Sequence, residues 1–243
     1  MAKEEKVAKF GQDYYDQDYF EADVTGGKEY RHPNGSIDNW GYHAKQLWSG
    51  WKGIIEPLRF LFRPERVLDV GCGTGSFVRE ARRNRLKAWG IDFSEWAIEN
   101  ALDGAEKWIK VGDARDIKEP DDSFDFEMVT DLMEHIYKKD VDAVIDGLYR
   151  VSNRWVFLQI ATVGMKDKPA EGYILKEGEP IPLELEAYAV AGHVTVQPQS
   201  WWEERLVRPG WRSRPDLVDR FRRLVDPKLI VNWRTILIEE RWP

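Results

Sequence analysis

A glycine-rich turn stands directly after a short apolar segment in the first third of the chain. Residues 67–70 read Val-Leu-Asp-Val, and Gly71, Gly73 and Gly75 follow at alternate positions. The β-favouring residues predict a strand that is covered on both faces. The glycines let the main chain bend sharply and let a ligand approach it closely. Because residues 76–85 can continue as a helix, free backbone N–H groups collect at this turn, where they bind the polar or anionic end of a ligand.

A carboxylate follows this turn at the distance at which nucleotide-binding folds place a ribose ligand. Asp92 ends the next apolar segment, residues 88–92, about 20 residues further on. The dinucleotide fingerprint, however, needs a third glycine at the position where this chain has Ser76. The turn and the carboxylate together indicate a nucleotide-like ligand, with a nicotinamide dinucleotide as an alternative that lacks part of its motif.

Two more carboxylates come directly after apolar segments that we expect to be strands. Asp113 follows residues 108–111, and Asp131 follows residues 124–130. In a parallel sheet the carboxyl ends of the strands meet at one edge, where ligands bind. We therefore expect the glycine turn, Asp92, Asp113 and Asp131 to lie together at that edge.

Histidines are the best candidates for moving a proton at such a site. His135 follows the expected strand at 124–130, and His193 follows a loop insertion. Imidazole has a pKa near the working pH of most enzymes, so either residue can act as a base or bind substrate, while a hydrogen-bonded structural histidine is the simpler alternative for both. With Asp131, they are our candidate catalytic residues.

No metal is expected from the sequence. The four histidines are scattered, at His32, His43, His135 and His193, and do not form a set with metal-ligand spacing. Cys72 is the only cysteine, which excludes an intrachain disulfide and a site built from cysteines.

The elements that must position these residues alternate between strand and helix along the middle of the chain. Such alternation predicts a doubly wound α/β fold around a mostly parallel sheet of seven strands, with helices on both faces. The expected strands are 67–70, 87–92, 108–111, 124–130 and 155–160, the expected helices are 75–85, 94–103 and 139–151, and residues 229–240 form a closing strand after a helix at 215–225.

The flanks of this region read differently. Residues 1–37 form an aromatic-rich arm with Tyr14, Tyr15, Tyr19 and Phe20, and residues 38–62 read as one or two helices, with Asp38 as a cap. We interpret residues 1–62 as an arm that either packs on the surface or closes as a lid, and residues 63–243 as the main domain. An insertion at about 163–192 follows the fifth strand and is expected over the active edge.

Basic residues gather near the C-terminus. Arg205, Arg208 and Arg212 lack the aspartate that precedes the arginines of helix 215–225 by one turn, so they are open candidates for binding a phosphate on a substrate. The arginines of helix 215–225 are instead explained as a solvated helix face, since aspartates precede them by one turn.

Composition limits the class of protein. The formal net charge is −7, which argues against broad nucleic-acid binding. The sequence has neither an apolar run long enough to span a membrane nor an apolar signal segment at its start. We therefore expect a cytoplasmic protein. A monomer or homodimer is our expectation for its assembly, although composition does not determine it.

The stretch Asp69-Val70-Gly71-Cys72-Gly73-Thr74-Gly75 resembles motif I of the class I S-adenosylmethionine (SAM)-dependent methyltransferases. The region from Phe124 to Ile136, with Thr130-Asp131-Leu132 and Glu134-His135, resembles motif IV of the same family. The likeness covers roughly residues 60–162. Many relatives have a Pro-Gly-Gly turn before the fifth strand, which this chain lacks.

The resemblance implies two groups of cofactor contacts. Around the methionine part of SAM it places Asp69, Gly71, Cys72, Gly73, Gly75 and Thr130. Around the adenosine part, Asp92 binds the ribose hydroxyls, Phe93 lies against the adenine, and Asp113 with Ala114 reads the adenine edge.

The function that the sequence favours is methyl transfer from SAM to an O or N atom of a small-molecule acceptor, with S-adenosylhomocysteine as product. A sugar or glycan precursor is our first acceptor class, from the tyrosine-rich arm and the acidic charge. The alternatives are an NAD(P)-dependent oxidoreductase, a non-catalytic SAM-binding scaffold, and a methyltransferase acting on protein or RNA. No nucleic-acid or membrane partner is expected.

Overall fold

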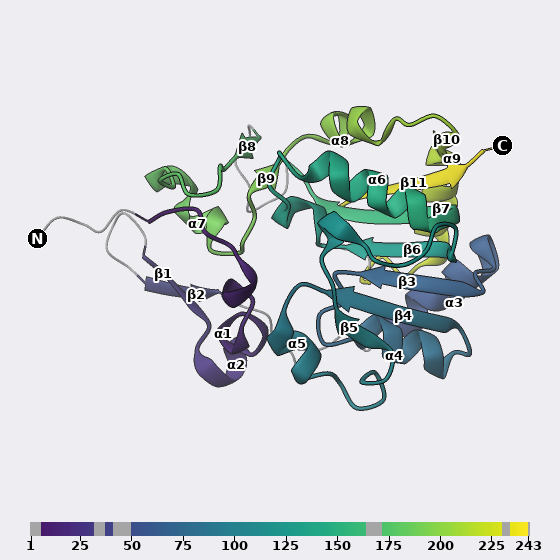
Figure 1. Cartoon of the computed structure of the whole chain (residues 1–243), viewed down its shortest axis with the longest axis horizontal. Coiled ribbons are helices and arrows are strands. Elements are labelled where there is room, and N and C mark those ends of the chain that lie inside the picture. Colours follow the sequence, from purple (N-terminus) through teal and green to yellow (C-terminus); the bar gives the residue numbers. More distant parts are fainter. Residues whose placement is uncertain (1–5, 32–36, 41–49, 164–171, 230–233, 243) are drawn as a thin grey trace, which may run out of the picture.

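The computed structural model describes residues 6–31, 37–40, 50–163, 172–229 and 234–242. Its centre is a seven-stranded sheet in the order β10-β11-β7-β6-β3-β4-β5 (Figure 1). The strands β3, β4, β5, β6 and β7 pair in parallel, whereas β11 runs antiparallel to both β7 and β10. This topology confirms the predicted doubly wound fold around a mostly parallel sheet of seven strands.

The central strands carry runs of mostly apolar residues. Their bounds are β3 (Arg66–Val70), β4 (Lys87–Asp92), β5 (Ile109–Val111), β6 (Phe124–Thr130), β7 (Ser152–Ala161), β10 (Trp211–Ser213) and β11 (Arg234–Arg241). Four of the five residues of β3 are buried, as expected of a strand with helices on both of its faces.

Helices cover the two faces of the sheet and enclose two apolar layers. On one face lie α3 (Trp51–Phe62), α4 (Ser76–Arg83) and α9 (Pro215–Leu224), and on the other lie α6 (Val141–Val151) and α8 (Gln199–Leu206). The short helix α5 (Glu95–Glu99) begins after Ser94, whose hydroxyl accepts the N–H of Ala97 as the predicted cap. Within the described residues, no helix is long and apolar enough to cross a membrane.

The N-terminal segments and the insertion form a smaller lobe at the end of the sheet toward which the parallel strands point (Figure 1). The N-terminal elements are η1 (Gln12–Tyr14), α1 (Gln17–Phe20), α2 (Ala22–Thr25), β1 (Lys28–Arg31) and β2 (Ile37–Trp40), and the insertion contributes β8 (Tyr173–Ile174), η5 (Leu183–Leu185), α7 (Glu186–Ala189) and β9 (Thr195–Val196). Ala8 shares a small apolar cluster with Tyr173 and Val196, so the two segments pack together.

The prediction for residues 38–62 is partly wrong. Asp38 caps no helix: it lies in β2, paired with Tyr30 of β1 in a hairpin. The helix begins at Trp51 and runs through Pro57 to Phe62 without ending at the proline, which is buried in the core. Burial of the apolar face of α3 outweighs the local penalty of an internal proline. The stretch 41–49 lies outside the described residues.

Candidate active site

The glycine turn leaves β3 at the carboxyl edge of the sheet. Gly71, Gly73 and Gly75 all have φ in the left-handed region, at 84°, 51° and 84°. A Cβ at Gly75 would lie 2.7 Å from Cβ of Ala105, so a side chain there is excluded by contact as well as by conformation. The turn then enters α4, which begins after Gly75 without a side-chain cap.

Asp92 is tied to this turn by its carboxylate. Oδ2 accepts the N–H of Gly73 at 2.7 Å, and Oδ1 accepts the N–H of Ser94 at 2.8 Å. Burial raises the pKa of Asp92, while these two hydrogen bonds act in the opposite direction. The neighbouring Asp69 is buried behind the turn, and burial followed by the charge of Asp92 raises its pKa well above the usual range. The edge therefore holds two buried carboxyl groups next to the glycine turn.

A second polar group lies beyond β5. Asp113 caps η3 (Ala114–Asp116), accepting the N–H of Arg115 at 2.9 Å, and the guanidinium of Arg115 binds both of its carboxylate oxygens. Although burial alone would raise the pKa of Asp113, these contacts with Arg115 lower it. The same guanidinium lies 5.2 Å from the ring centre of Phe93. An aromatic face and an ionised carboxylate thus frame one end of the edge.

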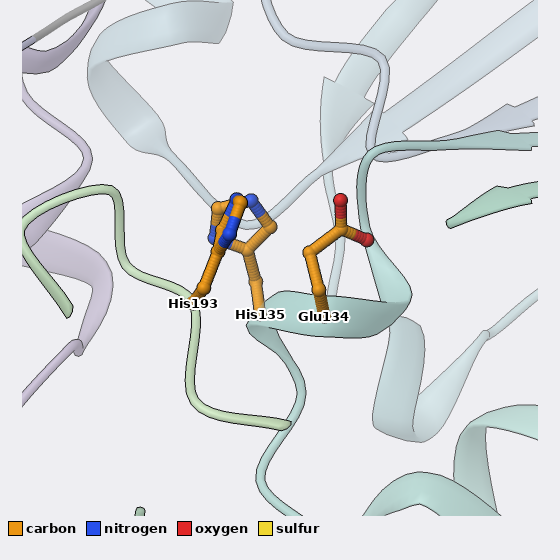
Figure 2. A group of neighbouring side chains, drawn as sticks. All are labelled: Glu134, His135 and His193. Atoms are coloured by element: carbon orange, nitrogen blue, oxygen red, sulfur yellow. The ribbon is translucent and has the colours of Figure 1, made fainter. Parts of the chain in front are cut away.

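The other end of the edge carries Asp131 and the two histidines. Asp131 adopts φ of 53°, unusual for a residue with a side chain, and its N–H is held by the carbonyl of Gln159 at 2.9 Å. His135 ends η4 (Met133–His135), and its ring centre lies 4.8 Å from that of His193. Figure 2 shows the two imidazoles next to one another, with Glu134 beside them.

The aromatic arm lies over both ends of this edge. The hydroxyl of Tyr15 is 3.3 Å from Nδ1 of His135. The backbone carbonyl of Tyr15 accepts a hydrogen bond from the hydroxyl of Ser94. Phe20 stacks on Trp96 with ring centres 5.6 Å apart and an interplanar angle of 11°. Gln12 donates from Nε2 to the carbonyl of Phe93 at 2.8 Å. One arm therefore contacts the loops after β4 and after β6 at once.

A family model described as a methyltransferase domain matches residues 43–212, more than half of the chain. The chain belongs to this family. Together with the strand order and the glycine turn, this match makes the protein a class I SAM-dependent methyltransferase, as the sequence predicted.

Several solved structures share the fold of this methyltransferase. A SAM-dependent methyltransferase from Mesorhizobium loti is 18% identical, with a TM-score of 0.54, over 79% of this chain and 100% of its own. The PH0226 protein from Pyrococcus horikoshii OT3 is 16% identical, with a TM-score of 0.52, over 81% of this chain and 93% of its own. Phosphoethanolamine N-methyltransferase 2 from Haemonchus contortus, solved with S-adenosylhomocysteine and phosphomonomethylethanolamine, is 19% identical, with a TM-score of 0.54, over 80% of this chain and 53% of its own.

The methyltransferase brings together most of the residues that the sequence singled out. The predicted cofactor contacts Asp69, Gly71, Cys72, Gly73, Gly75, Asp92, Phe93, Asp113, Ala114 and Thr130 all lie on the carboxyl ends of β3, β4, β5 and β6 or on the loops that follow them. His135 and His193, 58 positions apart in the sequence, are neighbours in space. His32 and His43 lie outside the described residues.

Two site residues of the methyltransferase were missed by sequence reasoning. Tyr15 was seen only as part of the aromatic arm, and Glu134 only as part of motif IV. Glu134 is fully buried, and its Oε1 accepts the N–H of Ala161 at 3.1 Å. Glu134 could have been predicted as a site residue from the dipeptide Glu134-His135, which directly follows the end of a strand. The position of Tyr15 could not, because it depends on packing between distant segments.

The three open arginines are not available for a phosphate. Arg205 and Arg208 form ion pairs with Asp142 on α6, at 2.7 and 3.2 Å, and Arg212 binds Glu240 at 2.6 Å. Asp142 and Glu240 are distant from these arginines in the sequence, so the spacing of residues along one helix does not predict the ion pairs. These ion pairs contradict the prediction that the three arginines are open candidates for binding a phosphate.

Proposed function

We propose that this methyltransferase transfers the methyl group of SAM to an O or N atom of a small-molecule acceptor. The observation that carries the proposal is the placement of two chemically different ends on one sheet edge. The first, with the glycine turn and Asp92, lies beyond the neighbouring strands β3 and β4, and the second, with Asp131 and the histidine pair, lies beyond β6. A donor lying across the first end would point its methyl group toward the second.

The cofactor half of the proposal assigns each contact a physical role. The turn through Gly71, Cys72, Gly73 and Gly75, together with the backbone of Thr130, lines the methionine moiety at close approach, and Asp69 orients its amino group from behind. Asp92 accepts the ribose hydroxyls with lone pairs that Gly73 and Ser94 do not use. At the adenine end, Phe93 offers its ring face, and Asp113 with the Ala114 N–H reads the base edge.

The acceptor half follows from the chemistry of the sulfonium. SAM carries an excellent leaving group, so alignment of the acceptor and exclusion of water supply most of the rate enhancement. The acceptor lone pair forms the new bond to the methyl carbon, and the electrons of the C–S bond go to sulfur, which gives neutral S-adenosylhomocysteine. A hydroxyl acceptor must also lose its proton, for which we propose the cluster of Asp131, His135 and His193. An amine needs only a neutral lone pair.

The arm supports a small acceptor over a macromolecular one. We propose that residues 1–62 act as a lid and that the insertion at 163–192 helps to enclose the acceptor, because Tyr15 and Tyr14 join the arm to His135 and to the carbonyl of Val190. A sugar or glycan precursor is the first class to screen, and a small amine is the second. We further propose a monomer or homodimer in the cytoplasm, in keeping with a single cysteine.

Calorimetric titration with S-adenosylhomocysteine tests the cofactor half first. We expect micromolar binding to the wild-type chain, binding weakened at least 10-fold in Asp92→Ala, and no binding of NAD. Radiolabelled SAM with sugar, amine, protein and RNA acceptors then tests the acceptor half. Binding of NAD in place of S-adenosylhomocysteine would replace the proposal by an oxidoreductase, and transfer to protein or RNA alone would contradict the small-molecule assignment.

A further inference from the structure

Three side chains with ligating atoms meet at the acceptor end of the edge. One carboxylate oxygen of Glu134 and one ring nitrogen each of His135 and His193 all lie within 4.8 Å of one another. Figure 2 shows that two of them come from the turn of η4 and the third from the loop that leads into β9. We expected no metal because the histidines are far apart in the sequence. In the folded chain, however, His135 and His193 are neighbours.

Backbone contacts hold the two contributing segments side by side. The N–H of Val194 donates to the carbonyl of Glu134 at 2.8 Å, and the hydroxyl of Thr195 donates to the carbonyl of Ile136 at 2.8 Å. The two residues that follow His193 are therefore hydrogen-bonded to the two residues that flank His135 in the sequence. The proximity of the two imidazoles follows from this pairing.

The spacing of the imidazoles suits a shared ion. Two rings that bind one ion through nitrogens at about 2.1 Å place their centres about 4.5 to 5.3 Å apart for bond angles near 90 to 110°. The observed separation is 4.8 Å, with ring planes 86° apart. Around a tetrahedral ion the ligand atoms lie about 3.3 Å apart, so the three groups must close by at most about 1.5 Å, which side-chain torsions supply.

The surroundings resemble the outer shell of a metal centre. Glu134 is fully buried, and the Ala161 N–H at 3.1 Å fixes the orientation of its carboxylate. Tyr15 Oη lies 3.3 Å from Nδ1 of His135, a contact that the ring can keep if it binds an ion through Nε2. Hydrogen bonds of this kind orient metal ligands and set the tautomer of a histidine.

We propose that Glu134, His135 and His193 bind one divalent transition-metal ion. Two imidazoles and a carboxylate suit Zn²⁺, Co²⁺ or Ni²⁺, whereas Mg²⁺ and Ca²⁺ prefer oxygen ligands alone. The role of the ion rests on the proposed function. An acceptor hydroxyl that coordinates the ion loses its proton to water at a lower pH, and its oxygen lone pair then attacks the methyl carbon while the C–S electrons go to sulfur.

Metal binding by the untagged full-length chain tests the site directly. After treatment with a chelator, the protein is titrated with Zn²⁺ by calorimetry and with Co²⁺ by visible absorption. We expect one equivalent of each to bind, with Zn²⁺ in the micromolar range or tighter. His193→Ala should weaken Zn²⁺ at least 100-fold and abolish the d–d bands of bound Co²⁺. Glu134→Gln should weaken Zn²⁺ at least 10-fold, while the exposed control Glu177→Gln should leave binding unchanged.

The outcomes separate this site from the proposed function. His193→Ala removes a partly exposed side chain, so a thermal midpoint and S-adenosylhomocysteine affinity close to wild type would show that the variant is folded. Stoichiometric Zn²⁺ that disappears in this variant supports the site, even if S-adenosylhomocysteine does not bind. Failure of Zn²⁺ to bind below millimolar concentration, or equal binding by His193→Ala, would overturn the site and leave methyl transfer to an imidazole base intact.

Discussion

The hydroxyl of Tyr15 lies 3.3 Å from Nδ1 of His135, although 120 positions separate the two residues in the sequence. Each partner belongs to a different part of the molecule: Tyr15 to the aromatic arm and His135 to the turn after β6. Ser94, on the loop after β4, binds the backbone of the same tyrosine. The arm thus joins the cofactor end of the edge to the acceptor end through a single residue.

Tyr15→Phe should slow methyl transfer while leaving the cofactor bound. The variant keeps the ring but loses the oxygen that contacts the imidazole, so the tautomer and orientation of His135 are no longer fixed. Since one hydrogen bond is worth about 1 kcal/mol, we expect kcat to fall about 5-fold. The Kd for S-adenosylhomocysteine should change less than about 3-fold, because this hydroxyl contacts His135 and not the glycine turn. Calorimetry and transfer assays on the same preparation provide both values.

Tyr14→Phe is the matched control for this prediction. Tyr14 lies on the same arm, but its hydroxyl donates to a backbone carbonyl, that of Val190 at 2.6 Å, and not to a histidine nitrogen. Its loss should lower the free energy of unfolding by about 1 kcal/mol and leave kcat within about 2-fold. Equal losses of kcat in both variants would mean that the arm acts only by covering the site.

Asp92→Asn should weaken cofactor binding with little change in shape. The amide keeps one carbonyl oxygen, so it can accept one of the two N–H groups that the carboxylate now accepts, from Gly73 and Ser94. Because hydrogen bonds to a charged acceptor are worth about 1.5 to 3 kcal/mol, we expect the Kd for S-adenosylhomocysteine to rise about 10- to 100-fold. Asp116→Asn, an exposed carboxylate on η3, is the control and should bind as wild type does.

Two adjacent carboxyl groups on β11 should respond to pH in opposite directions. Burial raises the pKa of Glu239 to about 7, with the Ser213 hydroxyl acting against it. Because the folded state holds this proton more tightly than the unfolded state, the free energy of unfolding falls as pH rises from about 4.5 to about 7. Glu239→Gln should remove that loss and make the protein more stable at pH 8 by up to about 3 kcal/mol.

Glu240 supplies the opposite case. Although burial acts in the other direction, Arg212 and Arg214 lower the pKa of Glu240. Its ion pairs therefore stabilise the fold above the ordinary carboxyl pKa, and this contribution is lost as pH falls through the lowered value. Urea unfolding at pH 5 and pH 8 measures both variants: Glu239→Gln should gain stability at pH 8, and Glu240→Gln should lose it. The same sign in both would contradict these pKa directions.

The sequence predicted the sheet well because local features define it. The bounds of β4 and β6 match the predicted segments 87–92 and 124–130, since each is an apolar run that ends at a turn residue. The gathering of the strand-end carboxylates followed from topology alone. By contrast, the strand that contains Asp38 and the ion pairs of Arg205 depend on partners distant in the sequence, which no local pattern specifies.

The acceptor end of the site depends on such distant contacts most of all. The neighbourhood of His135 is completed by Tyr15 from the arm and by His193 from the far side of the insertion. Neither segment has a strong apolar period, so its packing on the domain could not be derived from residue types and spacing. The chemistry of the histidines was predictable, but their pairing required the folded structure.

Gly192→Ala should disturb this pairing without unfolding the protein. Gly192 has φ of 79°, and a Cβ built on it would lie 3.0 Å from Nδ1 of His135 and 3.1 Å from Oη of Tyr15. The added methyl group is therefore too close to these two side chains, and at least one of them must move. Alanine in this backbone region also meets a strain of about 1 kcal/mol. We expect kcat to fall at least 10-fold while the affinity for S-adenosylhomocysteine stays near wild type.

Gly178→Ala separates strain from contact. Gly178 has nearly the same backbone conformation, with φ of 80°, but no heavy atom lies within 4 Å of the Cβ that would be added. Both variants should lose the stability that the shared backbone strain costs in urea unfolding, and Gly192→Ala should lose at least as much as Gly178→Ala. Only Gly192→Ala should lose transfer activity. If Gly178→Ala were equally inactive, the loss would come from destabilised loops, and the close approach of Gly192 to Tyr15 and His135 would have no part in catalysis.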